Sequence, residues 1–299
     1  MRTHVFALEI FIPYHGNPEF LFRAIRSVQA LEDTKWRLTI LEDCYPDGDA
    51  VRRRVEELDD GRITYLRNDR NLGPGLTQLR CIHMAEWDHF TVMDYDDMLL
   101  PNYGRVVADL FARHPDATFA QPNVEIVDEH DQPHRPLPDR IKWLVGARGR
   151  EVVLAGEPGV RSLLRANWTY NPALCYRRGP ITERLEHRPG IDCVCDLGRI
   201  VDIILAGGSL VVGSEVAFRY RRHRTSHSSS NARSGERFAQ ERNYFTGMAA
   251  ELRARGWNSA ARASRMRLFS RFNALSQLPG ALAGRNGELA GLLTRHALR

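Results

Sequence analysis

The chain has 299 residues, 43% hydrophobic and 26% charged, and no run of 18 apolar residues, so a globular fold is expected and a transmembrane helix is not. Its net charge of +5 is uneven, because residues 221–299 hold 15 arginines and four glutamates without lysine or aspartate, a charge of +11 that leaves −6 for residues 1–220. This bias favours an anionic partner such as a diphosphate, a lipid headgroup or nucleic acid, although a solvated helix face would show it too.

The N-terminal part of the chain alternates between strand-like and helix-like segments. Strands are predicted at residues 5–13, 36–42, 62–67 and 89–93, and helices at 17–31, 48–60, 75–85 and 102–114. The first helix has clear start signals, with Asn17 as N-cap and Pro18 at the first helical position. This alternation predicts an α/β fold with a mostly parallel central sheet flanked by helices, whose ligands bind beyond the carboxyl ends of the strands.

Beyond residue 115 the pattern is less regular. Residues 129–150 are rich in proline and charge, which predicts an irregular excursion. Order returns over 192–212, where Gly207 and Gly208 end a helix. Apolar residues with helical spacing predict one buried face of that helix: Leu197, Ile200, Val201, Ile204 and Leu205.

The C-terminal part is predicted to be mainly helical. Residues 209–223 are expected to form a strand, a turn and a second strand, and the small polar residues of 224–237 predict a mobile loop. Helices follow at about 236–255 and 257–277, and a short helix ends the chain.

The loops after the predicted strands exclude several families of α/β enzymes. A dinucleotide-binding fold needs GxGxxG directly after its first strand, where this chain has "PYHGNPEF". The Walker A sequence of P-loop NTPases and the GxSxG of α/β hydrolases are absent. A sugar nucleotidyltransferase would need a glycine-rich loop with Arg and Lys near the N-terminus, so that class remains only as an alternative.

Cysteine usage indicates a reducing compartment. The five cysteines form no CxxC pair, and the "CVC" of residues 193–195 has no matching Cys/His pair that would complete a zinc site. The N-terminus has no signal-peptide cleavage pattern. The expected location is cytoplasmic, with peripheral contact at the inner membrane face through the basic tail as an extension.

Three carboxylates follow the fourth predicted strand, "HFTVM". Asp94, Asp96 and Asp97 lie within four positions, where their charges would repel and raise each other's pKa unless a cation lies among them. A divalent metal takes carboxylate oxygens readily, so a metal site is predicted here. The competing interpretation is a run of helix-capping residues, but three carboxylates exceed what a cap needs.

Five segments in order resemble family 2 of the glycosyltransferases, which have the GT-A fold. They are "FIPYHGNPEFLFRAIRSV", "LEDCYPDGD", "NLGPGLTQLRCIHMA", "MDYDDMLLPNY" with the DxD motif, and "CDLGRIVDIILAGG" followed by "FRYRRHRTSHS". Each segment is weak alone, and their order and spacing over about residues 6–227 make the resemblance specific.

The resemblance implies a binding site for a nucleoside diphosphate sugar. Pro13 and Tyr14 would form one wall of the nucleoside pocket, with Tyr14 or His15 facing the base. Asp43, beside Glu42, would accept a hydrogen bond from the base, unless it only caps the following turn. Arg80 would lie near the phosphates, unless it is an ordinary surface arginine.

The resemblance also implies a metal site at the DxD motif. Asp94 and Tyr95 would contact the donor, and Asp94, Asp96 and His223 would hold Mn²⁺ or Mg²⁺, with Asp97 positioning the other carboxylates. Arg221 and His227 would belong to a loop that closes over the donor. A solvated basic loop is the alternative for this last segment.

The resemblance further implies a catalytic base. Asp196 occupies the position of the family's Asp, although Cys195 replaces the preceding Glu, and Asp192 is the reserve candidate. Trp168 and Tyr170 would line the acceptor cleft or else pack in the core.

An inverting glycosyltransferase with two parts is therefore expected. The GT-A domain would span 1–235, with a nucleotide-binding half at 1–115 and an acceptor-binding half at 116–235, and a basic helical extension would span 236–299. UDP is the expected donor nucleotide, with dTDP or GDP as alternatives, and the acceptor would be a saccharide, a lipid-linked sugar or a natural product.

The basic helices would contact a membrane or a second copy of the chain, and no nucleic-acid partner is expected. The alternative from another class is a non-catalytic protein that binds membrane or nucleic acid through the tail.

Overall fold

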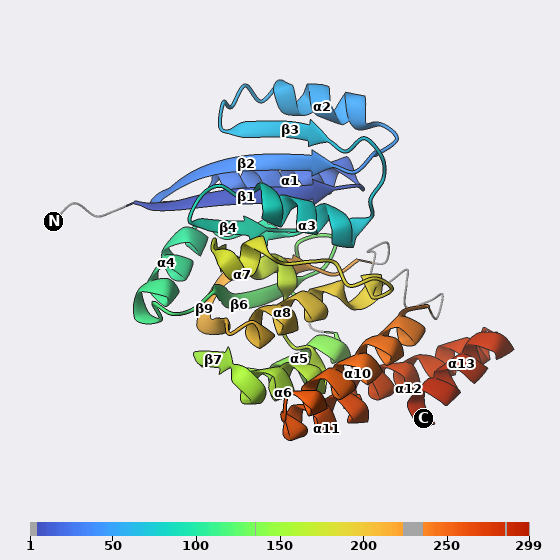
Figure 1. Ribbon diagram of the computed structural model, residues 1–299. Coiled ribbons are helices and arrows are strands. Elements are labelled where there is room, and N and C mark those ends of the chain that lie inside the picture. The colour runs from blue at the N-terminus through green and yellow to red at the C-terminus, as the bar shows by residue number, and fades with distance from the viewer. Residues whose placement is uncertain (1–4, 135, 224–235, 285, 299) are drawn as a thin grey trace.

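A central β-sheet with helices on both faces organises the computed structural model, which describes residues 5–134, 136–223, 236–284 and 286–298 (Figure 1). The strands are β1 Phe6–Tyr14, β2 Thr34–Glu42, β3 Ile63–Arg67, β4 His89–Val92, β5 Met98–Leu99, β6 Phe119–Val127, β7 Val152–Ala155, β8 Cys175–Arg177 and β9 Ser209–Arg221. The helices up to β9 are α1 Pro18–Gln29, α2 Gly48–Glu56, α3 Pro74–Met84, α4 Tyr103–Arg113, α5 Leu137–Val145, α6 Gly156–Ala166, α7 Pro180–Glu183 and α8 Cys195–Leu205.

The sheet has the order β3-β2-β1-β4-β8-β6-β9-β5, and β7 pairs with β9. The first four strands in this order are parallel, so the carboxyl ends of β1, β2, β3 and β4 meet at one edge. From β8 onward the sheet is mixed, because β8 runs antiparallel to both β4 and β6. The predicted α/β fold is confirmed: the N-terminal strands are all parallel, and in the second half β6 and β9 are parallel beside antiparallel neighbours.

The elements predicted before residue 115 are all present, because their local signals agree with their burial. The side chain of Asn17 accepts a hydrogen bond from the backbone N–H of Glu19 and caps α1. The apolar face of this helix is fully buried through Leu21, Ile25 and Val28. In the second half, the predicted face of α8 is buried as well.

Three predictions in the second half are wrong. Residues 129–150 contain α5, which begins directly after Pro136, so the stretch is not wholly irregular. Residues 209–221 form one strand, β9, with an irregular register opposite β6 in place of a turn. The helix predicted at 257–277 is two helices, separated at Arg267, which has a positive φ of 45°.

The C-terminal part comprises α10 Glu236–Ala254, α11 Asn258–Met266, α12 Leu268–Ala283 and α13 Gly287–Leu298. Helices α11 and α12 contact α6, and α13 packs on α10 and α12 at the right of Figure 1. Phe245, Met248 and Leu252 of α10 share one hydrophobic cluster with Leu197 and Ile200 of α8. The segments before and after residue 235, the proposed domain boundary, therefore share one hydrophobic core. Within the described part of the chain, each helix is too short or too polar to span a bilayer.

Candidate active site

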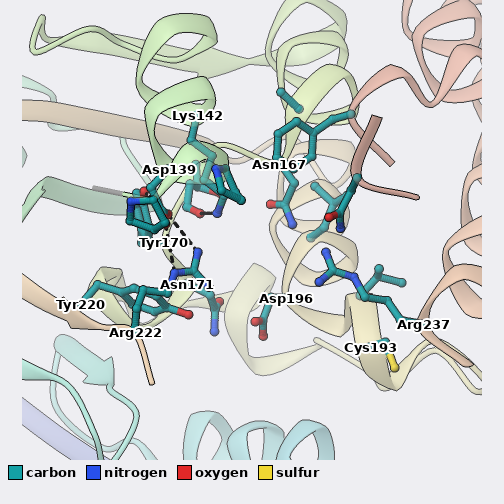
Figure 2. A pocket seen from close by; sticks show the side chains of 18 of the residues that line it. Asp139, Lys142, Asn167, Tyr170, Asn171, Cys193, Asp196, Tyr220, Arg222 and Arg237 are labelled. Carbon is teal, nitrogen blue, oxygen red and sulfur yellow. Dashed lines mark hydrogen bonds and ion pairs between the residues drawn. The ribbon is translucent and has the colours of Figure 1, made fainter. Parts of the chain in front are cut away.

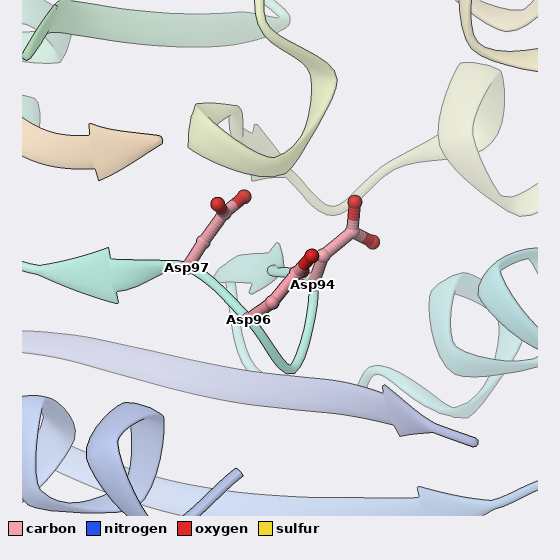
Figure 3. Close-up of side chains that lie close together, drawn as sticks. All are labelled: Asp94, Asp96 and Asp97. Atoms are coloured by element: carbon pink, nitrogen blue, oxygen red, sulfur yellow. The ribbon is translucent and has the colours of Figure 1, made fainter. Parts of the chain in front are cut away.

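The acidic loop of residues 94–97 lies at the carboxyl end of β4. Side-chain oxygens of Asp94, Asp96 and Asp97 lie within 4.8 Å of one another. Figure 3 shows the three carboxylates extending from one turn. The buried strand before the turn fixes its position, because Phe90 and Thr91 are fully buried in the sheet. The cluster predicted from the sequence is therefore brought together by the fold.

Each carboxylate of the acidic loop has a different support. Asp94 accepts a hydrogen bond from Nε2 of Gln78 at 3.1 Å, and Asp96 lies 2.7 Å from Nε2 of His223. Asp97 is buried, and its Oδ1 accepts from the backbone N–H of Arg221 at 2.8 Å. Its Oδ2 has no hydrogen-bond partner among the described residues. A buried carboxylate oxygen without a hydrogen-bond partner is unfavourable, and a bound ligand would satisfy it.

The electrostatics of the acidic loop suit a cation. Burial raises the pKa of Asp94 well above its ordinary value, and Asp96 and Asp196 add to the rise through repulsion. Burial raises the pKa of Asp97 in the same way, again with its two neighbours contributing. A divalent cation would stabilise the ionised carboxylates and reverse both shifts. The residues present therefore fit the metal ion that the sequence predicts.

Arg221 supports the acidic loop through hydrogen bonds to Asp96 and Asp97. Its side chain is fully buried, and it donates hydrogen bonds to the carbonyl oxygens of Asp96 and Asp128, both at 2.8 Å. It also pairs with Asp131 and lies over the ring of Phe20. With these partners, the guanidinium positions the loop. His227, predicted to close over the donor with Arg221, lies outside the described residues.

The residues predicted to form the nucleoside wall lie at the end of β1. Pro13 is half-buried and His15 is exposed, whereas Tyr14 is fully buried and donates its hydroxyl proton to the carbonyl of Gly16 at 2.9 Å. Of the two aromatic side chains, His15 therefore offers the accessible face. Gly16 lets Tyr95 approach, because a Cβ at position 16 would lie 2.2 Å from the Tyr95 hydroxyl.

Asp43 ties the end of β2 to the loop that follows β3. Its carboxylate accepts hydrogen bonds from Asn68 Nδ2 at 2.7 Å and from the backbone N–H groups of Leu72 and Gly73, both at 2.8 Å. Arg80, which is exposed, donates to Oδ1 of Asn68 at 2.6 Å. Asp43 therefore caps the loop after β3, and the Tyr45 N–H of the turn that directly follows Asp43 donates to Glu42 instead. The same bonds place Asp43, Asn68 and Arg80 at one edge of the sheet.

A cavity of about 590 Å³ extends from the acidic loop toward the C-terminal helices. Asp94 and His223 line one end, and Asp196 from α8 lines the same space. Figure 2 shows Asp196 at the centre of this cavity, with Arg222 to its left and Arg237 to its right. Helices α10 and α12 supply part of the wall, so the basic extension takes part in the site.

Of the two candidate bases, Asp196 lies in the cavity. Its side chain is 45% exposed, and Arg199 lies 3.9 Å away. Burial raises the pKa of the Asp196 carboxyl, and the nearby Arg199 opposes this rise. Water that reaches the side chain reduces the effect of burial. Asp192 is 55% exposed, lies 3.3 Å from His187 and is not among the described residues that line the cavity.

Arg199 and Gln78 connect the two ends of the site, and the sequence did not identify either. Arg199 is buried and donates to Oε1 of Gln78 at 3.0 Å, while Gln78 donates to Asp94. The buried cation thus acts on Asp94 and on Asp196 from one position. Arg199 follows Asp196 by three residues, so the two side chains share one helix face. This spacing is the signal in the sequence that could have identified Arg199.

A second polar group in the cavity was also missed. Asp139 is buried and accepts two hydrogen bonds from Arg222 and one from the Tyr170 hydroxyl at 2.9 Å. Lys142 lies 4.5 Å from the centre of the Tyr170 ring. Of the two aromatic residues predicted to line the acceptor cleft or to pack in the core, Tyr170 lines the cavity and Trp168 is buried in the core. The pairing joins α5 to Arg222, the residue directly after β9, and no local pattern reveals it.

The substitution Lys142→Met is expected to change how stability depends on pH. Burial is the main cause that lowers the pKa of Lys142 from 10.5 to about 7, with Arg222 contributing. Between these two values the unfolded chain holds a proton that the folded chain lacks, so the contribution of Lys142 to the free energy of unfolding rises with pH. The variant loses this rise.

Melting temperatures at about pH 7, 8.5 and 10 would measure the effect. From pH 7 to 10 the melting temperature of Lys142→Met should rise less, or fall more, than that of the wild type. Arg140→Met, at an exposed position of the same helix, is the control and should follow the wild-type curve. Parallel curves for Lys142→Met and the wild type would contradict the assignment.

Comparison with known sequences identifies one family. A model of glycosyl transferase family 2 matches residues 9–169, more than half of the chain. The putative colanic acid biosynthesis glycosyl transferase WcaA of Escherichia coli K12 is 32% identical over 95 residues, which cover 32% of this chain and 34% of that protein. The uncharacterized protein y4gI of Sinorhizobium fredii is 27% identical over 112 residues, 37% of this chain and 12% of that protein. The chain thus spans about a third or less of the length of these relatives.

Solved structures share the fold. Residues 1–349 of S. aureus TarS match with a TM-score of 0.62 and 12% identity, over 88% of this chain and 72% of that one. The same fragment in complex with UDP-GlcNAc gives 0.59 and 14%, over 80% and 65% of the two chains. GalNAc-T7 with UDP, GalNAc and Mn²⁺ gives 0.52 and 12%, over 74% and 45%. At such identities the likeness concerns the fold alone.

Proposed function

Because the chain belongs to glycosyl transferase family 2, we propose that it transfers a sugar from a nucleoside diphosphate sugar to an acceptor hydroxyl, with inversion at the anomeric carbon. The expected GT-A fold agrees with the likeness to the solved structures. The observation that carries the proposed activity is that Asp94, from the end of β4, and Asp196, from the start of α8, line one cavity. A donor bound at the acidic loop would then meet an acceptor held beside a carboxylate.

Mn²⁺ or Mg²⁺ is the proposed cofactor. Asp94 and Asp96 would hold the ion, Asp97 offers a buried oxygen without a partner among the described residues, and His223 would orient Asp96. When bound, the ion would neutralise negative charge on the departing nucleoside diphosphate. Arg221 keeps the acidic loop in place through its bonds to the loop backbone.

Asp196 is the proposed general base. Its carboxylate would accept the proton of the acceptor hydroxyl while the oxygen attacks the anomeric carbon, and the bond to the diphosphate would break on the opposite face. Arg199 would oppose the rise in the pKa of Asp196 and so favour the ionised form that a base requires. Asp192, which is not among the described residues that line the cavity, remains the second candidate for the general base.

The donor is proposed to be a UDP-sugar. Its base would lie against Pro13 and His15 near Asp43, and its phosphates would lie near Arg80 and the acidic loop. TarS and GalNAc-T7, which share the fold, have structures with UDP-GlcNAc and with UDP. The acceptor is proposed to be a saccharide, a lipid-linked sugar or a natural product, bound in the cavity between α5, α10 and α12.

Calorimetric titration of UDP, dTDP, GDP and ADP, each with and without Mn²⁺, tests the donor site. We expect UDP to bind at least about tenfold more tightly with Mn²⁺, because the ion links the carboxylates to the diphosphate. Binding of dTDP or GDP in place of UDP would correct the donor class and keep the site. If no nucleotide binds, or if Mn²⁺ has no effect, the proposed metal-dependent transfer is wrong.

A further inference from the structure

A second depression in the protein surface lies between α5, α6 and the start of α12. We call it the basic groove; it has a volume of about 880 Å³ and is lined by residues of these helices and of the loop from α5 to β7. It adjoins the cavity of the candidate active site, because Ala166 and Phe269 line both depressions. None of the residues assigned above to the donor, the metal ion or the base lines it.

Large apolar side chains are exposed in and beside the basic groove. Leu144 of α5 and Leu268 and Phe272 of α12 line it and are 50%, 52% and 46% exposed. Along α12 the apolar stripe continues through Leu275 and Leu282, because the spacing from Leu268 is four, seven and fourteen residues. Exposed apolar side chains that gather on adjoining helices mark a surface with a partner.

The charges around the basic groove are of one sign. Four arginines are among the described residues that line it, and those residues include no aspartate or glutamate: Arg148, Arg150, Arg161 and Arg165. The nearest acidic residues in the sequence are engaged elsewhere, since Glu151 pairs with Arg113 and Glu157 accepts hydrogen bonds at the start of α11. The partner of this surface should therefore combine apolar groups with negative charge.

We propose that the basic groove, with the apolar faces of α5 and α12 beside it, binds the surface of a membrane that contains anionic phospholipids. The apolar side chains would enter the boundary between headgroups and acyl chains, and the arginines would bind lipid phosphates. A second copy of the chain fits less well, because a twofold interface would place the same four arginines against each other. The surface is built mostly from segments that precede the basic tail, so it differs from the membrane contact predicted from net charge.

This surface has a consequence for the acceptor, which rests on the proposed function. Helix α5 presents Lys142 to the cavity and Leu144 to the groove, and α12 presents Asn273 to the cavity and Phe272 to the groove. Ala166 and Phe269 line both depressions, so the cavity and the groove adjoin at these two residues. Of the three proposed acceptor classes, a lipid-linked sugar is the one that such a membrane contact favours.

Co-sedimentation with vesicles tests the membrane contact. The full chain would be mixed with vesicles of phosphatidylcholine alone and of phosphatidylcholine with about 30% phosphatidylglycerol. We expect binding to the anionic vesicles and little to the neutral ones. Arg161→Gln with Arg165→Gln should weaken it about 30-fold, and Leu144→Ser with Phe272→Ser at least about tenfold.

Matched pairs of exposed residues on other faces serve as controls. Arg26→Gln with Arg53→Gln changes the net charge by the same amount, and Leu58→Ser with Leu66→Ser removes two apolar side chains that are 37% and 38% exposed. Both control pairs should bind vesicles like the wild type. All variants should keep their melting temperature and their metal-dependent UDP binding, which separates this test from failure of folding or of the proposed function.

Three results would overturn the proposed membrane contact. The first is no binding to either kind of vesicle, or equal binding to both. The second is a control charge pair that weakens binding as much as the groove pair does, since the contact would then reflect net charge alone. The third is a dimer in light scattering that Leu144→Ser with Phe272→Ser converts to monomers, which would make a second copy of the chain the occupant.

Discussion

Asp96→Asn is expected to lower kcat/KM for sugar transfer by at least about a thousandfold. The substitution keeps the size of the side chain and removes the negative charge with which Asp96, the partner of His223, would hold the metal ion. A metal ion at a departing diphosphate contributes several kcal/mol of transition-state stabilisation, and each 1.36 kcal/mol is a factor of ten in rate. The measurement is the release of UDP or of the nucleotide that calorimetry identifies, at saturating Mn²⁺.

The control for this substitution is Asp49→Asn, at a side chain of α2 that is 78% exposed. Its activity should stay within about a factor of two of the wild type, because an exposed ion pair contributes little. Nucleotide binding by Asp96→Asn should lose its dependence on Mn²⁺ while the melting temperature stays near that of the wild type. Undiminished transfer by a folded Asp96→Asn protein would remove the acidic loop from the mechanism.

Asp196→Asn is expected to lower kcat by about 10²- to 10⁴-fold, the usual contribution of a general base. Donor binding should persist, because Asp196 lies in the cavity beyond the acidic loop and is separate from the nucleoside wall. Asp192→Asn is the matched control from the same segment and should change kcat by less than about a factor of two, since its side chain is exposed beside His187. A larger effect at Asp192 than at Asp196 would exchange their roles.

The pH profile gives this assignment a second readout. A base must be deprotonated to act, so kcat/KM should rise with pH through the pKa of Asp196. The surrounding protein raises that pKa above its ordinary value of 3.8, so the acid limb should lie at higher pH than for an exposed aspartate. Asp196→Asn should remove the limb together with the activity, whereas Asp192→Asn should leave it in place.

The N-terminal half of the fold was predictable because its signals are local. The cap at Asn17, the buried face of α1 and the apolar strand before Asp94 each depend on residues within a few positions of one another. Topology then follows from strand–helix alternation, and it brings the ends of β1 and β4 to one edge. The acidic loop at that edge could therefore be expected from the sequence.

Elsewhere, distant partners decided the structure. Residues 209–221 form one strand because β6 pairs with it at intervals from Leu210 to Arg221. Helix α5 is held through Asp139, which accepts hydrogen bonds from Arg222 and Tyr170. The chain breaks at Arg267 between α11 and α12, and residues of α12 line the cavity together with residues of α10. These contacts join residues tens of positions apart, beyond the reach of periodicity.

By itself, the sequence determined the α/β fold, the acidic group at the end of β4, and Asp196 as a candidate for the base. Only the tertiary structure decided that Asp196 shares a cavity with Asp94, that Arg199 acts on both, and that Arg221 lies buried beneath the acidic loop. The same holds for the basic groove, whose apolar side chains and arginines come from α5, α6 and α12. Local pattern specifies elements because backbone hydrogen bonds and burial repeat at short intervals, whereas sites form where packed elements meet, and that requires the whole chain to be folded.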